Sequence, residues 1–225
     1  MTKLDPRLLS LLEDAALLQS KVPDSVLVGG SVAAYYAGHR LSFDHDHVIS
    51  DLDIRFQAVL EALEADPEYV VNRVTPGKII LGEHNQIEYG IRQLIRSRPL
   101  EVVDEVLPSG NSLRVPTLAE ALRIKSYLLI KRNQTRDYLD VAALSSRMGI
   151  TESAKVLTGI DAYYNDPNQE LGSVATQLVR MLINPQPADG SVTKNLKNYK
   201  SLQPRWQSWK SVCKVLEAVA LEVGE

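Results

Sequence analysis

The stretch that decides the fold is residues 25–49, SVLVGGSVAAYYAGHRLSFDHDHVI. It starts with a short apolar run typical of a buried strand, passes through two glycines, and continues as a predicted helix over residues 31–39. A second strand is predicted over residues 43–49. A strand, a glycine turn, a helix and a second strand in this order predict an α/β unit with a polar site at the turn.

The glycine turn consists of Gly29, Gly30 and Ser31. Glycine lets the backbone approach a phosphate closely, and the start of the following helix offers free N–H groups and the positive end of its dipole. An ordinary strand-to-helix turn uses the same residue types, so the turn alone leaves both interpretations open.

Two aspartates, Asp44 and Asp46, follow the turn after thirteen residues. Residues i and i+2 of a strand share a face, so the two carboxylates are expected to point the same way. Mg²⁺ binds one or two carboxylates together with substrate phosphates, and nucleotidyl transfer needs such a cation. Asp51 and Asp53 compete for this role, but with Ser50 as N-cap they suit the first turn of a helix.

Histidines provide a rival hypothesis. His39 with His45 and Asp46 resembles the ligand set of an HD-type phosphohydrolase, which holds a transition metal. The spacing is not a standard zinc signature, and on a strand His45 and His47 face away from the aspartates.

The rest of the chain predicts an α+β fold with two parts. An amphipathic helix over residues 4–19 precedes the decisive stretch, and another helix starts at residue 50. Residues 69–115 alternate as short strands separated by Gly, Pro and Asn, and from residue 117 the pattern is helical. We therefore expect a mixed sheet with flanking helices in residues 1–116 and a helical half in residues 117–225.

Two charges occupy apolar helix faces in the second part. Lys125 lies on the stripe of Leu118, Leu122 and Leu129, and Asp137 lies on the stripe of Val141, Leu144 and Met148. Buried charges need partners. Either Lys125 and Asp137 pair with each other, or Lys125 contacts a phosphate and Asp137 supplies a third acidic group. Glu88, on a predicted strand, is the alternative third acid.

Composition suits a water-soluble domain, with 44% hydrophobic and 24% charged residues and a net charge of −3. No apolar run approaches the length of a membrane span, no secretory signal is visible, and the lone Cys213 fits a reducing compartment, so a cytoplasmic location is expected. A segment without acidic residues, the acid-free segment, contains six positive charges and both tryptophans. Either the charges contact an RNA backbone and the tryptophans stack on bases, or the charges form a solvated helix face and the tryptophans belong to the core. These residues are Lys194, Lys197, Lys200, Arg205, Trp206, Trp209, Lys210 and Lys214.

Four stretches in this order resemble the nucleotidyltransferase AbiEii/AbiGii toxin family. They are Val28-Gly-Gly-Ser, Gly38-His-Arg-Leu-Ser-Phe-Asp-His-Asp, Leu122-Arg-Ile-Lys and Arg136-Asp-Tyr-Leu-Asp-Val-Ala-Ala-Leu, spanning residues 28–144. The combination is fairly specific, although each piece alone is weak. Histidines 45 and 47 depart from the apolar residues that the family more often has.

The resemblance implies a polymerase-beta-like nucleotidyltransferase core with a helical C-terminal half. It implies Mg²⁺ on Asp44 and Asp46, a functional lysine at Lys125, and a third acidic residue at Asp137. Relatives of this type are toxins paired with an antitoxin, and they transfer a nucleotide from NTP, such as ATP, to an acceptor that is tRNA in some cases. In this framework the glycine turn binds the triphosphate, and Arg40 and Ser42 brace the loop or touch phosphate.

Three hypotheses follow from the sequence. The chain is a Mg²⁺-dependent nucleotidyltransferase, an HD-like phosphohydrolase, or a non-catalytic relative that acts by binding a partner. The nucleotide, the acceptor and the oligomeric state are not readable from it.

Overall fold

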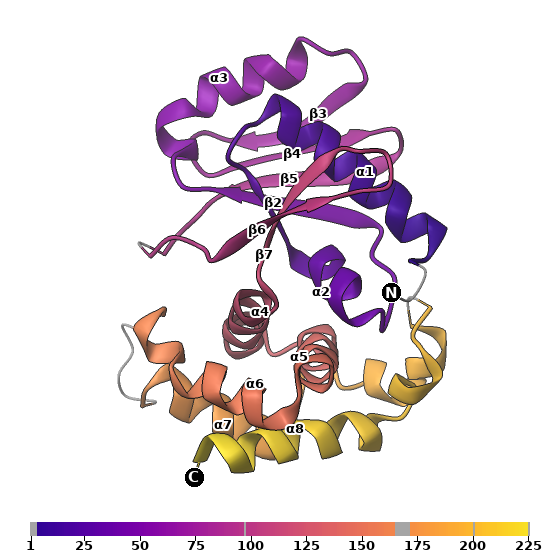
Figure 1. Cartoon of the computed structure of the whole chain (residues 1–225), viewed down its shortest axis with the longest axis vertical. Coiled ribbons are helices and arrows are strands. Elements are labelled where there is room, and N and C mark those ends of the chain that lie inside the picture. The colour runs from indigo at the N-terminus through magenta and orange to yellow at the C-terminus, as the bar shows by residue number, and fades with distance from the viewer. Residues whose placement is uncertain (1–3, 97, 165–171, 200, 225) are drawn as a thin grey trace. The chain divides into compact units, whose positions relative to one another are not determined.

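Every strand in the described part of the chain lies before residue 117, and helices follow from there. The computed structural model describes residues 4–96, 98–164, 172–199 and 201–224. It divides into two units, one of residues 1–35 and 41–117 and the other of residues 36–40 and 118–225 (Figure 1). A mixed sheet with flanking helices and a helical C-terminal half are both present, so the predicted α+β fold class is confirmed.

The first unit is built on a five-stranded sheet in the order β1-β2-β5-β4-β3. β2 and β5 run parallel, and the other neighbours are antiparallel. A separate hairpin pairs β6 with β7. The strands are β1 (Val26–Val28), β2 (Asp44–Ile49), β3 (Tyr69–Thr75), β4 (Ile79–His84), β5 (Ile87–Gln93), β6 (Val102–Val106) and β7 (Ser112–Pro116).

Two helices, α1 (Pro6–Lys21) and α3 (Leu52–Glu64), cover one face of this sheet. α1 begins where the Asp5 side chain caps the N–H of Arg7 and Pro6 takes the first helical position, which needs no N–H donor. Apolar side chains of α1 and α3 meet the sheet in one core. Its buried members are Leu18, Val22, Ile49, Leu52, Val59, Leu63, Tyr69, Ile80, Tyr89 and Ile91.

The start of α3 differs from the prediction. The N-cap position is Asp51 rather than Ser50, and Asp51 makes no capping hydrogen bond. Its carboxylate instead accepts from Arg55 Nε at 2.8 Å, an i,i+4 pair on the helix surface. The arginine one turn later therefore draws this acid away from the helix end.

The second unit contains only helices among its described residues. Predicted helices over 151–183 and 192–222 are broken into shorter pieces, and residues 165–171 lie outside the described ranges. The elements are α4 (Leu118–Arg132), α5 (Thr135–Met148), α6 (Ile150–Thr158), η1 (Ile160–Ala162), α7 (Val174–Ile183), η3 (Val192–Asn198), η4 (Pro204–Trp206) and α8 (Trp209–Gly224). α2 (Gly29–Ala37) starts in the first unit and ends in the second.

Candidate metal and nucleotide site

The carboxylates of Asp44 and Asp46 lie on the face of β2 that the core does not occupy. Asp44 is exposed and Asp46 is partly exposed, whereas His45 and His47 between and after them are buried. This alternation is the period-2 pattern of a strand with one covered face. The two acids therefore point to the same side.

The glycine turn lies directly beside Asp46. β1 pairs with β2 so that Val28 is opposite Asp46, and Gly29 follows Val28 with a φ of +83°, which favours glycine. A Cβ added at Gly29 would lie 3.4 Å from Asp46 Oδ2. α2 begins at Gly29, so the free N–H groups of its first turn start next to the carboxylate.

The side chain of Ser31, the third residue of the glycine turn, points into the protein. It is fully buried, and its hydroxyl donates to the carbonyl oxygen of Val28 at 3.4 Å. Any contact of Ser31 with a phosphate is thus limited to its backbone N–H.

The neighbouring strand β5 brings a third carboxylate to the same face. In the parallel pair, Asp44 is opposite Glu88 and Asp46 is opposite Gly90. Register partners share a face of the sheet, so the exposed Glu88 lies beside Asp44. A Cβ at Gly90 would be 2.6 Å from Asp46 Oδ1, so the missing side chain leaves the space that this carboxylate occupies.

Two polar side chains contact the aspartates. Arg92 Nε lies 3.5 Å from Asp46 Oδ1, and Ser42 Oγ donates to Asp44 Oδ1 at 3.3 Å. The Arg92 pair is solvent-exposed and therefore weak, which leaves its guanidinium available to an incoming anion. Ser42 braces one of the two predicted metal ligands.

The donor set suits Mg²⁺ better than a transition metal. Within the described ranges, no group of three or more His, Cys, Asp and Glu side chains is arranged to hold a metal ion. Mg²⁺ needs only one or two carboxylates because water and substrate phosphates complete its octahedron. Asp44 and Asp46, on an open face with space cleared at Gly90, fit that requirement.

His39 and His45 each bond a different aspartate, which counts against their sharing a metal ion in an HD-type arrangement. His39 Nε2 bonds Asp140 in the helical unit at 2.7 Å, whereas His45 Nε2 bonds Asp14 in the first unit at 2.9 Å. Both rings are fully buried.

Asp140 is the centre of a buried charge cluster in the helical unit. Its carboxylate accepts from His39 Nε2 at 2.7 Å, Arg40 Nε at 2.8 Å and Arg40 Nη2 at 2.9 Å, and it pairs with Lys125 Nζ at 2.8 Å. Burial acts to raise the pKa of Asp140, but the charges of Arg40 and Lys125 outweigh it and hold that pKa well below its usual range. Arg40, predicted to touch phosphate or brace its loop, is thus fixed to α5.

Of the two alternatives for Lys125 and Asp137, a direct pair is not formed, because the lysine pairs with Asp140, one helical turn further along α5. Asp137 is fully buried, and neither of its carboxylate oxygens has a hydrogen-bond partner among the described residues. Burial raises the pKa of Asp137, against the opposing charge of Lys125. Asp137 is therefore a buried carboxyl group with a raised pKa and with unused hydrogen-bonding capacity among the described residues.

In the acid-free segment the described basic side chains are exposed, whereas Trp206 is buried. Lys194, Lys197, Arg205, Lys210 and Lys214 are exposed, and Lys200 lies outside the described residues. Trp206 is only 5% exposed, which fits the alternative of a core tryptophan and not that of a base-stacking one. Trp209 is half-buried with its ring edge toward Tyr138, at 5.9 Å between centroids.

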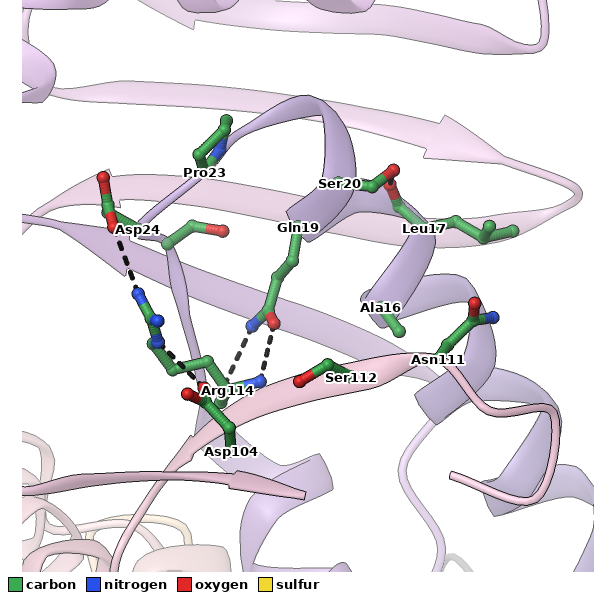
Figure 2. Close-up of a pocket in the computed structure, with 11 residues that line it drawn as sticks. Ala16, Leu17, Gln19, Ser20, Pro23, Asp24, Asp104, Asn111, Ser112 and Arg114 are labelled. Carbon is green, nitrogen blue, oxygen red and sulfur yellow. Dashed lines mark hydrogen bonds and ion pairs between the residues drawn. The ribbon is translucent and has the colours of Figure 1, made fainter. Parts of the chain in front are cut away.

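A hollow of about 440 Å³ lies elsewhere on the first unit, between α1 and the β6–β7 hairpin. Figure 2 shows Arg114 bridging Asp24 and Asp104, at 3.1 and 3.0 Å, while the Gln19 amide exchanges two hydrogen bonds with the Arg114 backbone. None of the predicted site residues lines it.

Sequence reasoning missed four residues of these clusters: Gly90, Arg92, Asp14 and Asp140. Gly90 and Arg92 join the site through long-range strand pairing, for which no local signal exists. Asp14 and Asp140 did leave a signal, because each is a carboxylate three or four residues from buried apolar positions on its helix.

Comparison with known proteins gives two kinds of similarity, while no family model matches the chain. Curated relatives by sequence are the heme uptake protein MmpL11 of Mycobacterium tuberculosis, 44% identical over 94 residues, and the mycolic acid-containing lipids exporter MmpL11 of Mycolicibacterium smegmatis, 45% identical over 96 residues. Each match covers 42% of this chain and 10% of the relative, so the chain spans about a tenth of their length. No helix in the described ranges is both long and apolar enough to span a bilayer.

Solved structures resemble the chain over almost its whole length. The nucleotidyltransferase toxin MenT4 of Mycobacterium tuberculosis H37Rv aligns with a TM-score of 0.56 and 17% identity, covering 97% of this chain and 83% of that one. A nucleotidyltransferase from H. pylori aligns with a TM-score of 0.52 and 14% identity, covering 96% and 93%. At these identities the likeness concerns the fold, and this chain therefore has the fold of the nucleotidyltransferases.

Proposed function

We propose that this protein is a Mg²⁺-dependent nucleotidyltransferase that moves the nucleoside monophosphate of an NTP onto an acceptor hydroxyl. One observation supports this most directly. The aspartate pair of β2 shares an open sheet face with Glu88 and lies beside the glycine turn at the start of α2. A cation and a triphosphate need these two surfaces next to each other.

Each part of the site has a role in this proposal. The backbone N–H groups of Gly29, Gly30 and Ser31 bind phosphate oxygens at the positive end of α2. Asp44 and Asp46 hold Mg²⁺, which when bound neutralises phosphate charge and activates the attacking oxygen. Ser42 keeps the Asp44 carboxylate in place through its hydrogen bond.

The reaction is an in-line substitution at the α-phosphorus. The acceptor oxygen forms the new bond to phosphorus, the bond to the β-phosphate oxygen breaks, and pyrophosphate leaves with that electron pair. The acceptor proton passes to an acidic side chain, for which Glu88 is favoured because it lies beside Asp44 on the same face. Arg92 compensates phosphate charge once its exposed contact with Asp46 is released.

Two residues of the helical unit complete the proposal. The family resemblance implies that Lys125 is a phosphate-binding lysine and that Asp137 is the alternative third acid, and burial raises the pKa of Asp137. Asp140 engages Lys125 in the described structure, so a phosphate must compete with this carboxylate for the lysine.

We propose further that the acceptor is an RNA such as tRNA, and that the activity is toxic unless a cognate antitoxin protein restrains it. The exposed lysines of the acid-free segment suit a phosphate backbone. MenT4, which shares the fold, is a nucleotidyltransferase toxin.

The decisive experiment incubates the protein with each α-labelled NTP, Mg²⁺ and total tRNA, and measures label retained on RNA. Wild type is expected to transfer label, and the double variant Asp44→Asn with Asp46→Asn is expected to lose at least about a thousandfold of the rate. The matched control is Asp51→Asn with Asp53→Asn, which removes the other aspartate pair and should retain transfer. Absence of label transfer and of NTP binding in the wild type would refute the proposal.

The two rival functions give different results in the same samples. An HD-like phosphohydrolase would copurify with a transition metal and release phosphate instead of transferring label. A non-catalytic binding protein would keep any growth effect in cells after both metal-site aspartates are replaced.

A further inference from the structure

Behind the aspartate pair, four polar side chains form a buried chain. Asp14 of α1, His45 and His47 of β2 and His84 of β4 are each at most 5% exposed. Burying four polar groups in a sheet core is unfavourable unless each finds a partner. The position is also where apolar side chains would ordinarily pack.

The four side chains bond one another in sequence. His84 Nδ1 lies 2.5 Å from Asp14 Oδ1, Asp14 Oδ2 lies 2.9 Å from His45 Nε2, and His45 Nδ1 lies 2.9 Å from His47 Nε2. Tyr69 stacks on the His84 ring at 4.0 Å between centroids, and the Tyr89 ring lies 6.3 Å from that of His45.

The donor and the acceptor of each of these hydrogen bonds can be assigned from the buried nitrogen of His47. Nδ1 of His47 is buried and has no partner among the described residues, so a proton there would be an unsatisfied donor. His47 therefore has its proton on Nε2 and donates to His45 Nδ1. His45 must then have its proton on Nε2, which donates to the Asp14 carboxylate. Asp14 is the acceptor at which the chain ends.

These hydrogen bonds hold β2, the strand that carries Asp44 and Asp46. Successive side chains of β2 point to opposite faces, so holding His45 and His47 on one face determines the direction of Asp44 and Asp46 on the other. A hydrogen bond is directional, whereas apolar packing is not. The Asp14–His45 bond thus adds a directional restraint on β2 to the ladder bonds that this strand makes with β1 and β5.

We propose that His45 and Asp14 are positioning residues for the metal-binding carboxylates of β2. The inference rests on the proposed function, since it assigns the ion to Asp44 and Asp46. Neither side chain touches the substrate, and both act through the strand. His84 shares the same Asp14 carboxylate but lies on β4, so its bond contributes to stability without orienting the acids.

The test compares His45→Phe with His84→Phe. Both substitutions keep a ring in the core and remove one bond to Asp14, but only the first lies on β2, where it also removes the bond to His47. The ion probe is Mn²⁺, whose binding to the full chain is measured by its paramagnetic resonance signal without any nucleotide. We expect His45→Phe to weaken Mn²⁺ binding about tenfold relative to wild type, and His84→Phe to leave it within about twofold, as for outer partners of metal ligands.

A second pair keeps the test decisive if the phenylalanine at position 45 prevents folding. His45→Gln places an amide N–H where Nε2 was and retains the contact with Asp14, whereas His45→Asn places it near Nδ1 and loses that contact. Binding of Mn²⁺ by the Gln variant near the wild-type level, with weak binding by the Asn variant, supports the inference. Equal binding by these two variants, or equal weakening by His45→Phe and His84→Phe, overturns it.

Failure of the proposed function gives a different pattern. If the wild type binds Mn²⁺ but transfers no nucleotide, the transferase proposal fails, and the ratios among the variants still decide the positioning role. If the wild type binds no Mn²⁺, the assignment of the ion to the aspartates fails and the inference falls with it.

Discussion

Gly90→Ala is expected to lower activity strongly while leaving the stability of the fold almost unchanged. The new Cβ would lie 2.6 Å from Asp46 Oδ1 and 3.2 Å from Leu81 Cδ2. Ordinary contact begins at 3.4 Å, so the carboxylate must move by about 0.8 Å, while the leucine needs only a small shift at its flexible end. The partly exposed Asp46 side chain has solvent to move into.

The expected effect on activity is large, because a displacement of about 1 Å in a reacting assembly costs about a hundredfold in rate. Stability should change little. The backbone at Gly90 does not have a positive φ, so alanine is compatible there and reduces the entropy of the unfolded chain by an amount worth up to about 1 kcal/mol. A melting temperature within about 4 °C of wild type is expected.

The assay measures label transfer from NTP to RNA and, separately, Mn²⁺ binding, with circular dichroism to follow unfolding. The control is Gly159→Ala, whose added Cβ has its nearest neighbour at 3.9 Å in the helical unit. A Gly90→Ala protein that transfers nucleotide at the wild-type rate would refute the placement of Asp46 in the reaction.

Three further outcomes are expected. Asp140→Asn leaves the buried cations Arg40 and Lys125 without their anion and should lower the free energy of unfolding of the helical unit by about 3–5 kcal/mol. Urea unfolding followed by tryptophan fluorescence measures this change, because both tryptophans lie in that unit. An unchanged urea midpoint would contradict the charge cluster. Burial lowers the pKa of His39 below that of a histidine in the unfolded chain, so the unfolded state binds the extra proton. The free energy of unfolding should therefore fall as the pH drops below about 6.5, by up to about 1.4 kcal/mol per pH unit. A free energy of unfolding that stays constant from about pH 7.5 to 5.5 disproves this. Of the two acids, Glu88→Gln should slow transfer more than Asp137→Asn when both are assayed across pH, and the reverse order would assign the proton acceptor to the helical unit.

The parts of the site that depend on local periodicity were predictable. Alternation along a strand places Asp44 and Asp46 on one face whatever the partner strands are, and Gly29 marks the turn that precedes this strand because few other residues tolerate its backbone conformation. The fold class followed in the same way from the change of pattern near residue 116.

The parts that depend on pairing between distant segments were not predictable. Glu88 could be named as a candidate acid, but its place beside Asp44, like that of Arg92 beside Asp46, depends on the particular register in which β5 runs parallel to β2, and strand register is set by the whole sheet. For Lys125, both Asp137 and Asp140 lie on the same side of α5, so helical spacing alone leaves the choice between them open. The close packing of Arg40 and His39 around Asp140 decides it.

The parallel pairing of β2 with β5 also bears on how the protein folds. Asp44 and Glu88, the partners in this register, are separated by an antiparallel hairpin and a helix that form from nearer segments of the chain. Closing such a long loop is slow relative to local structure. The surface formed by Asp44, Asp46 and Glu88 is consequently completed after the hairpin and helix, and the onset of ion binding in a refolding experiment would time this long-range pairing.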